Sequence, residues 1–250
     1  PIIDIDLGDV VGFEALMRWT REDGSIVSPA EFIPIAEETG TIVPIGAWAL
    51  LEALTHLRGW INEGICSRDA TMSVNVSPRQ LHDPNFVPVV HEALMRSQIA
   101  PDQLWLEVTE GVMIAQPDQA LDTLTRLCEY GVRVAIDDFG TGYSSLSLLQ
   151  KFPIQRLKID KSFIHGVADD LGARSLVRTI IAMGDSLGLD MVAEGVETAV
   201  QLQALVELRC SKAQGYLISH PVAPSMMATT IASLEQFGGW SKTKGRNPNS

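Results

Sequence analysis

The segment Arg133-Val134-Ala135-Ile136-Asp137-Asp138-Phe139-Gly140-Thr141-Gly142-Tyr143-Ser144-Ser145 is typical of a buried strand that ends at a functional site. An apolar run leads into two adjacent carboxylates and then into a loop with two glycines, which is how a buried strand delivers charge to a site. Adjacent aspartates repel each other, and no lysine or arginine follows them before Lys151. A divalent cation with oxygen ligands would offset this repulsion. The simpler alternative is an Asx-rich turn at a strand end.

Strand and helix patterns alternate on both sides of this segment. The expected strands are residues 2–7, 10–18, 71–76, 104–108, 132–136, 156–159, 190–193 and 213–216, and the expected helices are residues 29–38, 45–63, 84–98, 117–130, 143–151, 168–187, 197–208 and 224–237. The first two strands form a hairpin through Gly8-Asp9, and Ser28-Pro29-Ala30-Glu31 is similar to a capping box. This alternation predicts an α/β protein with a parallel sheet and outer helices, and eight strands favour a closed barrel over an open sheet.

Length and composition bound the domain organisation. The 250 residues, 46% of them hydrophobic, suffice for one α/β barrel, which we expect over residues 1–240. Residues 241–250 are polar and aperiodic, so we expect a disordered tail there. The sequence opens directly on a strand-like pattern at Pro1, so we expect it to be a fragment of a longer chain, truncated at the N-terminus.

Charge and cysteine usage exclude several classes of protein. The formal net charge of −12 argues against binding of a DNA or RNA polymer, although a small phosphate substrate remains compatible if metals supply positive charge. Three widely spaced cysteines and five unpaired histidines make a disulfide framework or a zinc site improbable. The sequence has no membrane-spanning stretch and no signal-peptide pattern, which favours a cytoplasmic domain.

Polar residues fall at the C-terminal ends of successive expected strands. They are Glu14, Asn75, Glu107, Asp137 with Asp138, Lys158, Glu194 and Gln214. In a parallel barrel these ends meet at one face, where active sites are built. Their oxygens suit magnesium or manganese, and the carboxylates suffice for two ions that share Asp137, which is the arrangement that promotes in-line attack on a phosphodiester.

Each of these residues also has a simpler interpretation. Glu14 and Lys158 fit half-exposed strand positions, Asn75 fits a turn, and Glu107, Glu110, Glu194 and Glu197 fit caps or favourable charges at helix starts. Independent surface charges would not all fall at the same end of strands with apolar interiors. Their coincidence therefore favours a site.

Several short motifs carry a resemblance to a known family. They are Glu14-Ala15-Leu16-Met17-Arg18-Trp19, Asn75-Val76-Ser77, Glu107-Val108-Thr109-Glu110, Asp137 to Leu146, Lys158-Ile159-Asp160, Ala193-Glu194-Gly195-Val196-Glu197-Thr198 and Gln214-Gly215-Tyr216. In this order, over residues 1–236, they resemble the motifs of EAL domains, the cyclic di-GMP phosphodiesterases of bacterial signalling.

The resemblance implies a TIM-like (βα)8 barrel whose first strand is antiparallel to the rest. It also implies hydrolysis of cyclic di-GMP to linear pGpG, dependent on two Mg²⁺ or Mn²⁺ ions. By position, the residues that resemble ligands of the first ion are Glu14, Asn75, Glu107 and Asp137, those that resemble ligands of the second are Asp137 and Asp138, and Glu194 resembles a further metal-site carboxylate. Lys158 resembles the lysine that holds the attacking water, and Gln214 resembles a glutamine that supports the site. Leu16 and Arg18 resemble substrate-binding residues, and Glu110 and Glu197 resemble structural carboxylates near the loop Phe139–Ser145.

The sequence departs from the family pattern at two places. The Tyr-Gln that commonly precedes the proline matching Pro1 is absent, and Arg209-Cys210-Ser211 stands where Gly-Cys-Asp is frequent. The first departure bears on substrate affinity, and the second is expected to perturb a turn before the last strand. Neither departure changes an expected metal ligand.

The resemblance also implies partners and leaves two other functions open. We expect a homodimer, upstream regulatory domains in the full-length protein and, through these, a full-length protein that is membrane-tethered. One alternative is a catalytically inactive receptor for cyclic di-GMP. The other is a metal-dependent hydrolase that acts on a different nucleotide.

Overall fold

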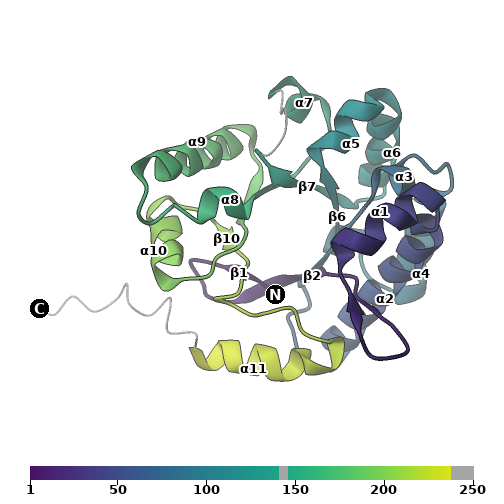
Figure 1. Cartoon of the computed structure of the whole chain (residues 1–250), viewed down its shortest axis with the longest axis horizontal. Helices are drawn as coiled ribbons and strands as arrows, with labels where there is room; N and C mark the ends of the chain where they lie inside the picture. The colour runs from purple at the N-terminus through teal and green to yellow at the C-terminus, as the bar shows by residue number, and fades with distance from the viewer. Residues whose placement is uncertain (141–145, 238–250) are drawn as a thin grey trace, which may run out of the picture.

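A closed barrel of eight strands lies at the centre of the computed structural model, which describes residues 1–140 and 146–237 (Figure 1). The barrel strands are β1 (Ile2–Asp4), β2 (Val10–Ala15), β5 (Thr71–Asn75), β6 (Leu104–Thr109), β7 (Arg133–Phe139), β8 (Arg156–Ile159), β9 (Asp190–Ala193) and β10 (Lys212–Ala213). Their order around the barrel is β1-β10-β9-β8-β7-β6-β5-β2, and only β1 is antiparallel to its two neighbours. The predicted barrel with an antiparallel first strand is therefore confirmed.

Helices surround the barrel in Figure 1. They are α1 (Pro29–Thr39), α2 (Ile42–Asn62), α3 (Pro78–Leu81), α4 (Phe86–Ser97), α5 (Glu110–Ala115), α6 (Pro117–Glu129), α7 (Leu146–Lys151), α8 (Lys161–Ile164), α9 (Leu171–Leu187), α10 (Ala199–Glu207) and α11 (Met227–Phe237), with short 3-10 helices η1 (Pro101–Gln103) and η2 (Pro224–Met226). A separate two-stranded sheet joins β3 (Trp19–Thr20) and β4 (Ile26–Val27). None of the helices that the structure describes is long and apolar enough to cross a membrane.

The two faces of the barrel strands differ sharply in polarity. Leu106 and Leu157 are fully buried among the apolar core residues that pack against the helices. Glu107 and Lys158 are the next residues along the same strands, and they point to the opposite face because side chains alternate along a strand. The barrel interior is thus the polar compartment of the molecule, and the hydrophobic core lies outside it.

The N-terminal hairpin is shorter than its sequence pattern predicts. β1 ends at Asp4 rather than residue 7, because the Asp4 carboxylate accepts hydrogen bonds from the backbone N–H groups of Asp6 (3.0 Å) and Leu7 (2.9 Å) and closes a turn. β2 ends at Ala15 rather than residue 18, and a new strand begins at Trp19.

Helix starts differ in detail from the sequence expectations. Ser28 makes no side-chain cap although α1 begins after it as predicted, so the expected capping box does not form. Helix α2 begins at Ile42 instead of residue 45, since Pro44 is tolerated in a first helical turn. The short helices α3, α5 and α8 and the sheet β3–β4 were not expected. Of the expected helix 143–151 only α7 lies within the described residues, and the expected tail 241–250 lies outside them.

Candidate metal and phosphodiester site

One lysine lies at the centre of the polar residues at the C-terminal end of the barrel. Lys158 is 1% exposed, and its Nζ lies 2.6 Å from Glu107 Oε2, 2.6 Å from Glu194 Oε1, 3.0 Å from Asp137 Oδ1 and 3.4 Å from Glu14 Oε2. These carboxylates come from β2, β6, β7 and the end of β9, so the barrel closure brings them together. The solvated strand positions considered for Lys158 and Glu14, and the helix cap considered for Glu107, are wrong.

Two amides fix the Glu14 carboxylate. Asn75 Nδ2 donates to Glu14 Oε1 at 2.8 Å, and Gln214 Nε2 donates to Glu14 Oε2 at 2.6 Å. The Gln214 backbone N–H donates to Ala193 O at 2.9 Å, which extends the pairing of β10 with β9 up to the site. Both amides therefore orient an anionic oxygen donor rather than end a turn.

The carboxyl groups around Lys158 differ in the direction of their pKa shifts. Burial raises the pKa of Glu14, but Lys158 and the hydrogen bonds from Gln214 and Asn75 outweigh it and hold this pKa below its ordinary value. Burial raises the pKa of Glu107 and of Glu194, and Lys158 only partly compensates. A desolvated cluster with one ammonium is therefore short of positive charge.

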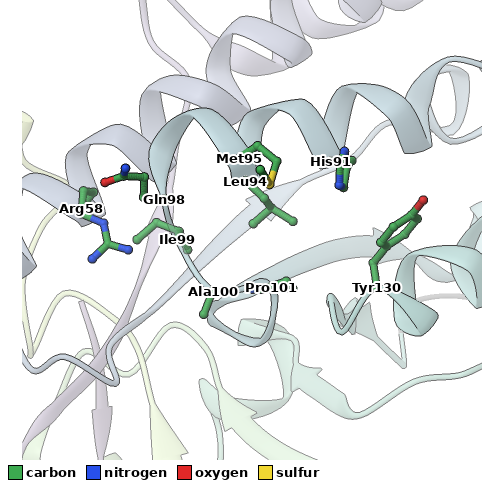
Figure 2. A pocket seen from close by; sticks show the side chains of 9 residues that line it. All are labelled: Arg58, His91, Leu94, Met95, Gln98, Ile99, Ala100, Pro101 and Tyr130. Carbon is green, nitrogen blue, oxygen red and sulfur yellow. The ribbon is translucent and has the colours of Figure 1, made fainter.

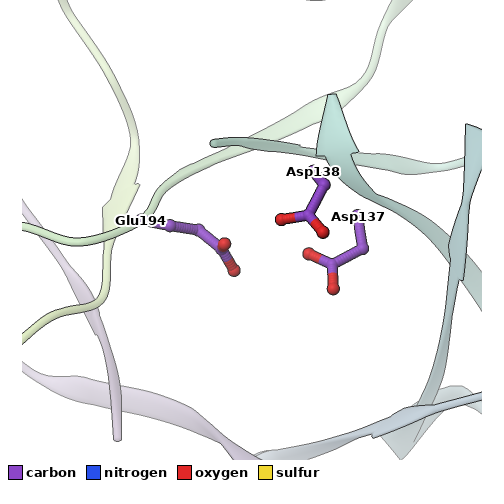
Figure 3. A group of neighbouring side chains, drawn as sticks. All are labelled: Asp137, Asp138 and Glu194. Carbon is purple, nitrogen blue, oxygen red and sulfur yellow. The ribbon is translucent and has the colours of Figure 1, made fainter. Parts of the chain in front are cut away.

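Three carboxylates converge at the mouth of this cluster. Oxygens of Asp137, Asp138 and Glu194 lie within 4.8 Å of one another, and Figure 3 shows Glu194 facing the two aspartates from the opposite side. Asp138 adopts a left-handed backbone conformation, with φ of 53°, directly after Asp137. Two consecutive residues of a regular strand point to opposite faces, so this irregularity is what brings both side chains to one site.

The structure adds Asp160, which the sequence analysis did not single out. Asp160 is 8% exposed and hydrogen-bonds to Asp138, and its position two residues after Lys158 at the end of β8 was the available signal. Partial burial, with Asp137 and Asp160 nearby, raises the pKa of Asp138 to about 6. A hydrogen bond between two carboxyl groups requires a proton on one of them, which a cation would replace.

The residues present fit divalent cations. Five carboxylates (Glu14, Glu107, Asp137, Asp138 and Glu194) surround one ammonium, so the ionised cluster carries four excess negative charges, as many as two divalent cations carry positive ones. Gln214 Oε1 is buried and accepts no hydrogen bond from the described residues. Oxygen donors of this kind suit magnesium or manganese.

The remaining candidate residues lie around this cluster rather than in it. Glu110 is buried, and its Oε1 accepts from the Gly140 backbone N–H at 2.8 Å. Leu16 and Arg18 are exposed beyond the end of β2, and the Arg18 guanidinium donates to Met17 O at 2.8 Å. Glu197 is exposed, and only its backbone N–H binds a described group, Gln201 Oε1 at 2.8 Å. Residues 141–145 of the expected loop lie outside the described residues.

A surface pocket of about 510 Å³ lies elsewhere on the molecule (Figure 2). It is lined by Arg58, His91, Leu94, Met95, Gln98, Ile99, Ala100, Pro101 and Tyr130. Pro101 and Tyr130 precede β6 and β7, so the pocket is at the N-terminal end of the barrel strands, opposite the carboxylates. It lacks the convergent charges of the carboxylate cluster, which remains the candidate site.

Two curated proteins are similar to this chain over most of its length. MucR of Pseudomonas aeruginosa, a bifunctional diguanylate cyclase/cyclic di-GMP phosphodiesterase, is 40% identical over 225 residues, which are 90% of this chain and 33% of MucR. An uncharacterized signaling protein of Caulobacter vibrioides is 41% identical over 239 residues, which are 95% of this chain and 29% of that protein. The chain thus spans at most about a third of the length of these curated relatives.

Solved structures show the same barrel. The MucR phosphodiesterase in complex with c-di-GMP superposes with a TM-score of 0.85 at 40% identity, covering 91% of each chain. The FimX EAL domain from Pseudomonas aeruginosa bound to c-di-GMP superposes with a TM-score of 0.79 at 25% identity, covering 90% of this chain and 89% of that one. Residues 1–221 match the model of the EAL domain, and the chain therefore belongs to the EAL domain family.

Proposed function

We propose that this domain hydrolyses one 3′-5′ phosphodiester bond of cyclic di-GMP to give linear pGpG, with two Mg²⁺ or Mn²⁺ ions as cofactors. The observation that carries the proposal is the convergence of four carboxylates on buried Lys158 at the end of the barrel, with Asp138 beside Asp137 and Glu194, and Gln214 bound to Glu14. The MucR phosphodiesterase, whose structure contains c-di-GMP, supports this choice of substrate.

Each residue has a specific part in the proposed reaction. Glu14, Asn75, Glu107 and Asp137 would hold the first ion, and Asp137, Asp138 and Glu194 would complete the second site. Bound there, the ions would lower the pKa of an attacking water and neutralise charge on the phosphate. Lys158 and Asp138 orient that water for in-line attack, and Gln214 keeps Glu14 in place.

Substrate contacts fall to the exposed residues beyond β2. Leu16 is 41% exposed at this end of the barrel, so it offers an apolar surface beside the carboxylates. The Arg18 guanidinium, which donates to Met17 O, is exposed and can turn to a phosphate, for which its two parallel N–H groups are suited. Arg18 would then bind a substrate phosphate beside the carboxylate cluster.

A receptor that binds cyclic di-GMP without cutting it is the second candidate. It is favoured by the four ion pairs of Lys158, which already give each of four carboxylates a cationic neighbour. The FimX EAL domain, solved with c-di-GMP bound, is a structural neighbour. The two candidates differ in whether product appears.

Incubation of the protein with cyclic di-GMP, in Mn²⁺, in Mg²⁺ and in EDTA, tests the proposal. We expect pGpG with either metal and none in EDTA. Glu14→Ala removes a carboxylate from the cluster and should abolish turnover, whereas Glu52→Ala on the exposed face of α2 should not. Binding without product in metal-replete buffer would establish the receptor, and product from Glu14→Ala would overturn the assignment of this residue.

We further propose that the domain acts as a homodimer joined to upstream regulatory domains, which set its activity. The presence of further domains is supported by the length of the curated relatives, since the chain spans at most about a third of them. Light scattering at several protein concentrations tests the homodimer. A constant monomer mass would contradict it.

A further inference from the structure

Below the candidate site, the barrel interior holds a second charged group. Arg156 is 3% exposed, and its Nε and Nη2 lie 2.9 and 2.8 Å from Asp190 Oδ2. Lys212 binds the other oxygen of Asp190, and Ser211 Oγ lies 3.4 Å from that oxygen. Asp190, Arg156 and Lys212 occupy the first positions of β9, β8 and β10, so they form the floor of the barrel.

Arg156 of the floor lies near Glu107, a carboxylate of the candidate site. Glu107 pairs with Ala135 in the sheet register, and Ala135 pairs with Arg156, so Glu107 and Arg156 flank Ala135 at one level of the interior. Ala135 carries only a methyl group, so its side chain is too small to separate the other two. The Arg156 guanidinium lies 3.7 Å from the Trp105 ring centroid, so it is fixed over this ring, two positions below Glu107 on β6.

Four buried polar atoms on the neighbouring strands β5, β6 and β8 lack a hydrogen-bond partner among the described residues. They are Arg156 Nη1, Trp105 Nε1, Ser73 Oγ and Glu107 Oε1, and Ser73 is the register partner of Trp105. Each residue is at most 3% exposed, so bulk water does not reach these atoms. A buried polar group without a hydrogen-bond partner destabilises the folded state, so four such atoms indicate that a further partner binds them.

We propose that an internal water binds between these four atoms and makes Arg156 a positioning residue for Glu107. The water accepts hydrogen bonds from Arg156 Nη1 and Trp105 Nε1 and donates to Glu107 Oε1 and Ser73 Oγ, so two donors and two acceptors match its four bonds. Glu107 Oε2 contacts Lys158, so the water and the lysine together fix both oxygens of this carboxylate.

This inference rests on the proposed function in one respect, that Glu107 holds a cation. A ligand carboxylate that is oriented by a partner behind it loses less conformational freedom when the metal binds. The floor of Asp190, Arg156 and Lys212 would then set metal affinity from a distance, without contact to substrate. In this arrangement Arg156 orients Glu107 through a water, whereas Gln214 and Asn75 orient Glu14 by direct hydrogen bonds.

Metal affinity of conservative variants tests the positioning role. Trp105→Phe, Ser73→Ala and Arg156→Lys each remove one bond to the water, while Arg156→Lys keeps a cation beside Asp190. We expect Mn²⁺ binding, measured by titration calorimetry, to weaken about tenfold for Arg156→Lys and less for the other two. The matched controls Trp60→Phe and Ser97→Ala change buried residues of α2 and α4 and should leave the affinity within twofold.

Melting temperatures of all five variants separate positioning from folding. If the residues around the water only stabilised the fold, Trp105→Phe and Ser73→Ala would lower the melting temperature without weakening Mn²⁺ binding relative to their controls. That result would overturn the positioning role.

A crystal structure of the metal-free wild-type protein tests the water itself. We expect one ordered water within hydrogen-bond distance of at least three of the four atoms, and its loss or displacement in Trp105→Phe. If the space holds no water, or Arg156 turns to bind Glu107 directly, the proposal is wrong. If the wild-type protein binds no Mn²⁺, the proposed function fails separately, and the diffraction result still decides the water site.

Discussion

Lys158 is the residue on which the candidate site depends. Burial alone would lower its pKa, but four surrounding carboxylates outweigh burial and raise this pKa well above its ordinary value. The lysine is therefore a fixed positive charge at neutral pH and cannot serve as a general base there. In the metal-free protein it holds the acidic residues of β2, β6, β7 and the end of β9 together.

Replacement of Lys158 by Met should destabilise the metal-free protein and make its stability depend on metal. Removal of one partner of a buried ion pair costs about 3–5 kcal/mol, because uncompensated charge remains. We expect urea unfolding in EDTA to show this loss, and saturating Mn²⁺ to recover more of the stability in this variant than it adds to the wild type. Lys151→Met breaks an exposed pair with Asp118 and serves as the control. Equal metal stabilisation of variant and wild type would contradict the prediction.

Arg209 shows the structural cost of a departure from the family pattern. It adopts φ of 61° at the turn before β10, where the family frequently has glycine. A non-glycine residue in this backbone region destabilises the folded state by roughly 1–2 kcal/mol. Arg209→Gly removes this strain, but the greater conformational freedom of glycine in the unfolded chain offsets part of the gain, so the substitution should stabilise the protein by about 0.5–1 kcal/mol. Urea unfolding measures this, with exposed Arg21→Gly as the control. A loss of stability on Arg209→Gly would contradict the strain.

The sequence could predict Glu14, Glu107, Asp137, Lys158 and Glu194 because each marks the end of a strand whose interior is apolar. It could not predict the unpaired atoms of Ser73, Trp105 and Arg156, since these residues are related only through the register of four strands, β5 to β8. Asp160 was missed for the same reason: its contact with Asp138 depends on the irregularity between β7 and β8.

Among the elements, a hydrogen bond from the end of β7 to helix α5 supports the strand end that carries the site aspartates. Glu110 begins α5, and its side chain binds the backbone at Gly140, one residue beyond β7. Gly140 has φ of 99°, and a Cβ there would lie 2.6 Å from Phe163 Cε2, so only glycine fits. Asp137 and Asp138 lie within this anchored strand end.

Glu110→Ala should therefore weaken metal binding although Glu110 touches no candidate ligand atom. Release of Gly140 lets the aspartate pair shift, and the loss of such an outer contact typically costs about 10–100-fold in metal affinity or activity. Mn²⁺ titration and turnover of cyclic di-GMP measure the effect, with exposed Glu129→Ala on α6 as the control. Unchanged affinity and turnover would show that this contact does not support the site.

Element boundaries were less predictable than element order. The alternation of periodicities specifies strands and long helices such as α2 and α9, whereas α5 and α8 are too short to show a helical period. Helix α8 instead begins with a local contact, since Asp160 Oδ1 accepts from the Ser162 backbone N–H at 2.9 Å. The polar residues at the starts of these two short helices, Glu110 of α5 and Asp160 before α8, lie beside the site.

Over the whole molecule, the barrel interior separates two charged groups. Carboxylates in excess lie at the C-terminal end, where a cation and a substrate can enter. At the N-terminal end one carboxylate, Asp190, lies between two cations, Arg156 and Lys212, so each charge there has a partner of opposite sign within the protein. We therefore expect the floor to contribute stability that is independent of metal, in contrast to the site above it.

The pH dependence of unfolding distinguishes the floor from ordinary surface charge. Burial raises the pKa of Asp190, but Arg156 and Lys212 outweigh it and hold this pKa below its ordinary value of 3.8. A carboxylate with a lowered pKa in the folded state contributes stability that is present above its unfolded pKa and is lost as the pH falls through its folded pKa.

Asp190→Asn should accordingly lower the free energy of unfolding by about 3 kcal/mol at pH 7, because it leaves buried Arg156 and half-buried Lys212 without their partner. The difference from wild type should be constant between pH 5 and 7, roughly a unit or more above the unfolded pKa, and should shrink below about pH 4 as the wild-type carboxylate takes up a proton. Urea unfolding in EDTA across this range measures it. Asp102→Asn breaks an exposed pair with Arg133 and should cost at most about 1 kcal/mol throughout. A difference that persists undiminished at pH 3 would mean that packing of the residue, and not its charge, stabilises the barrel floor.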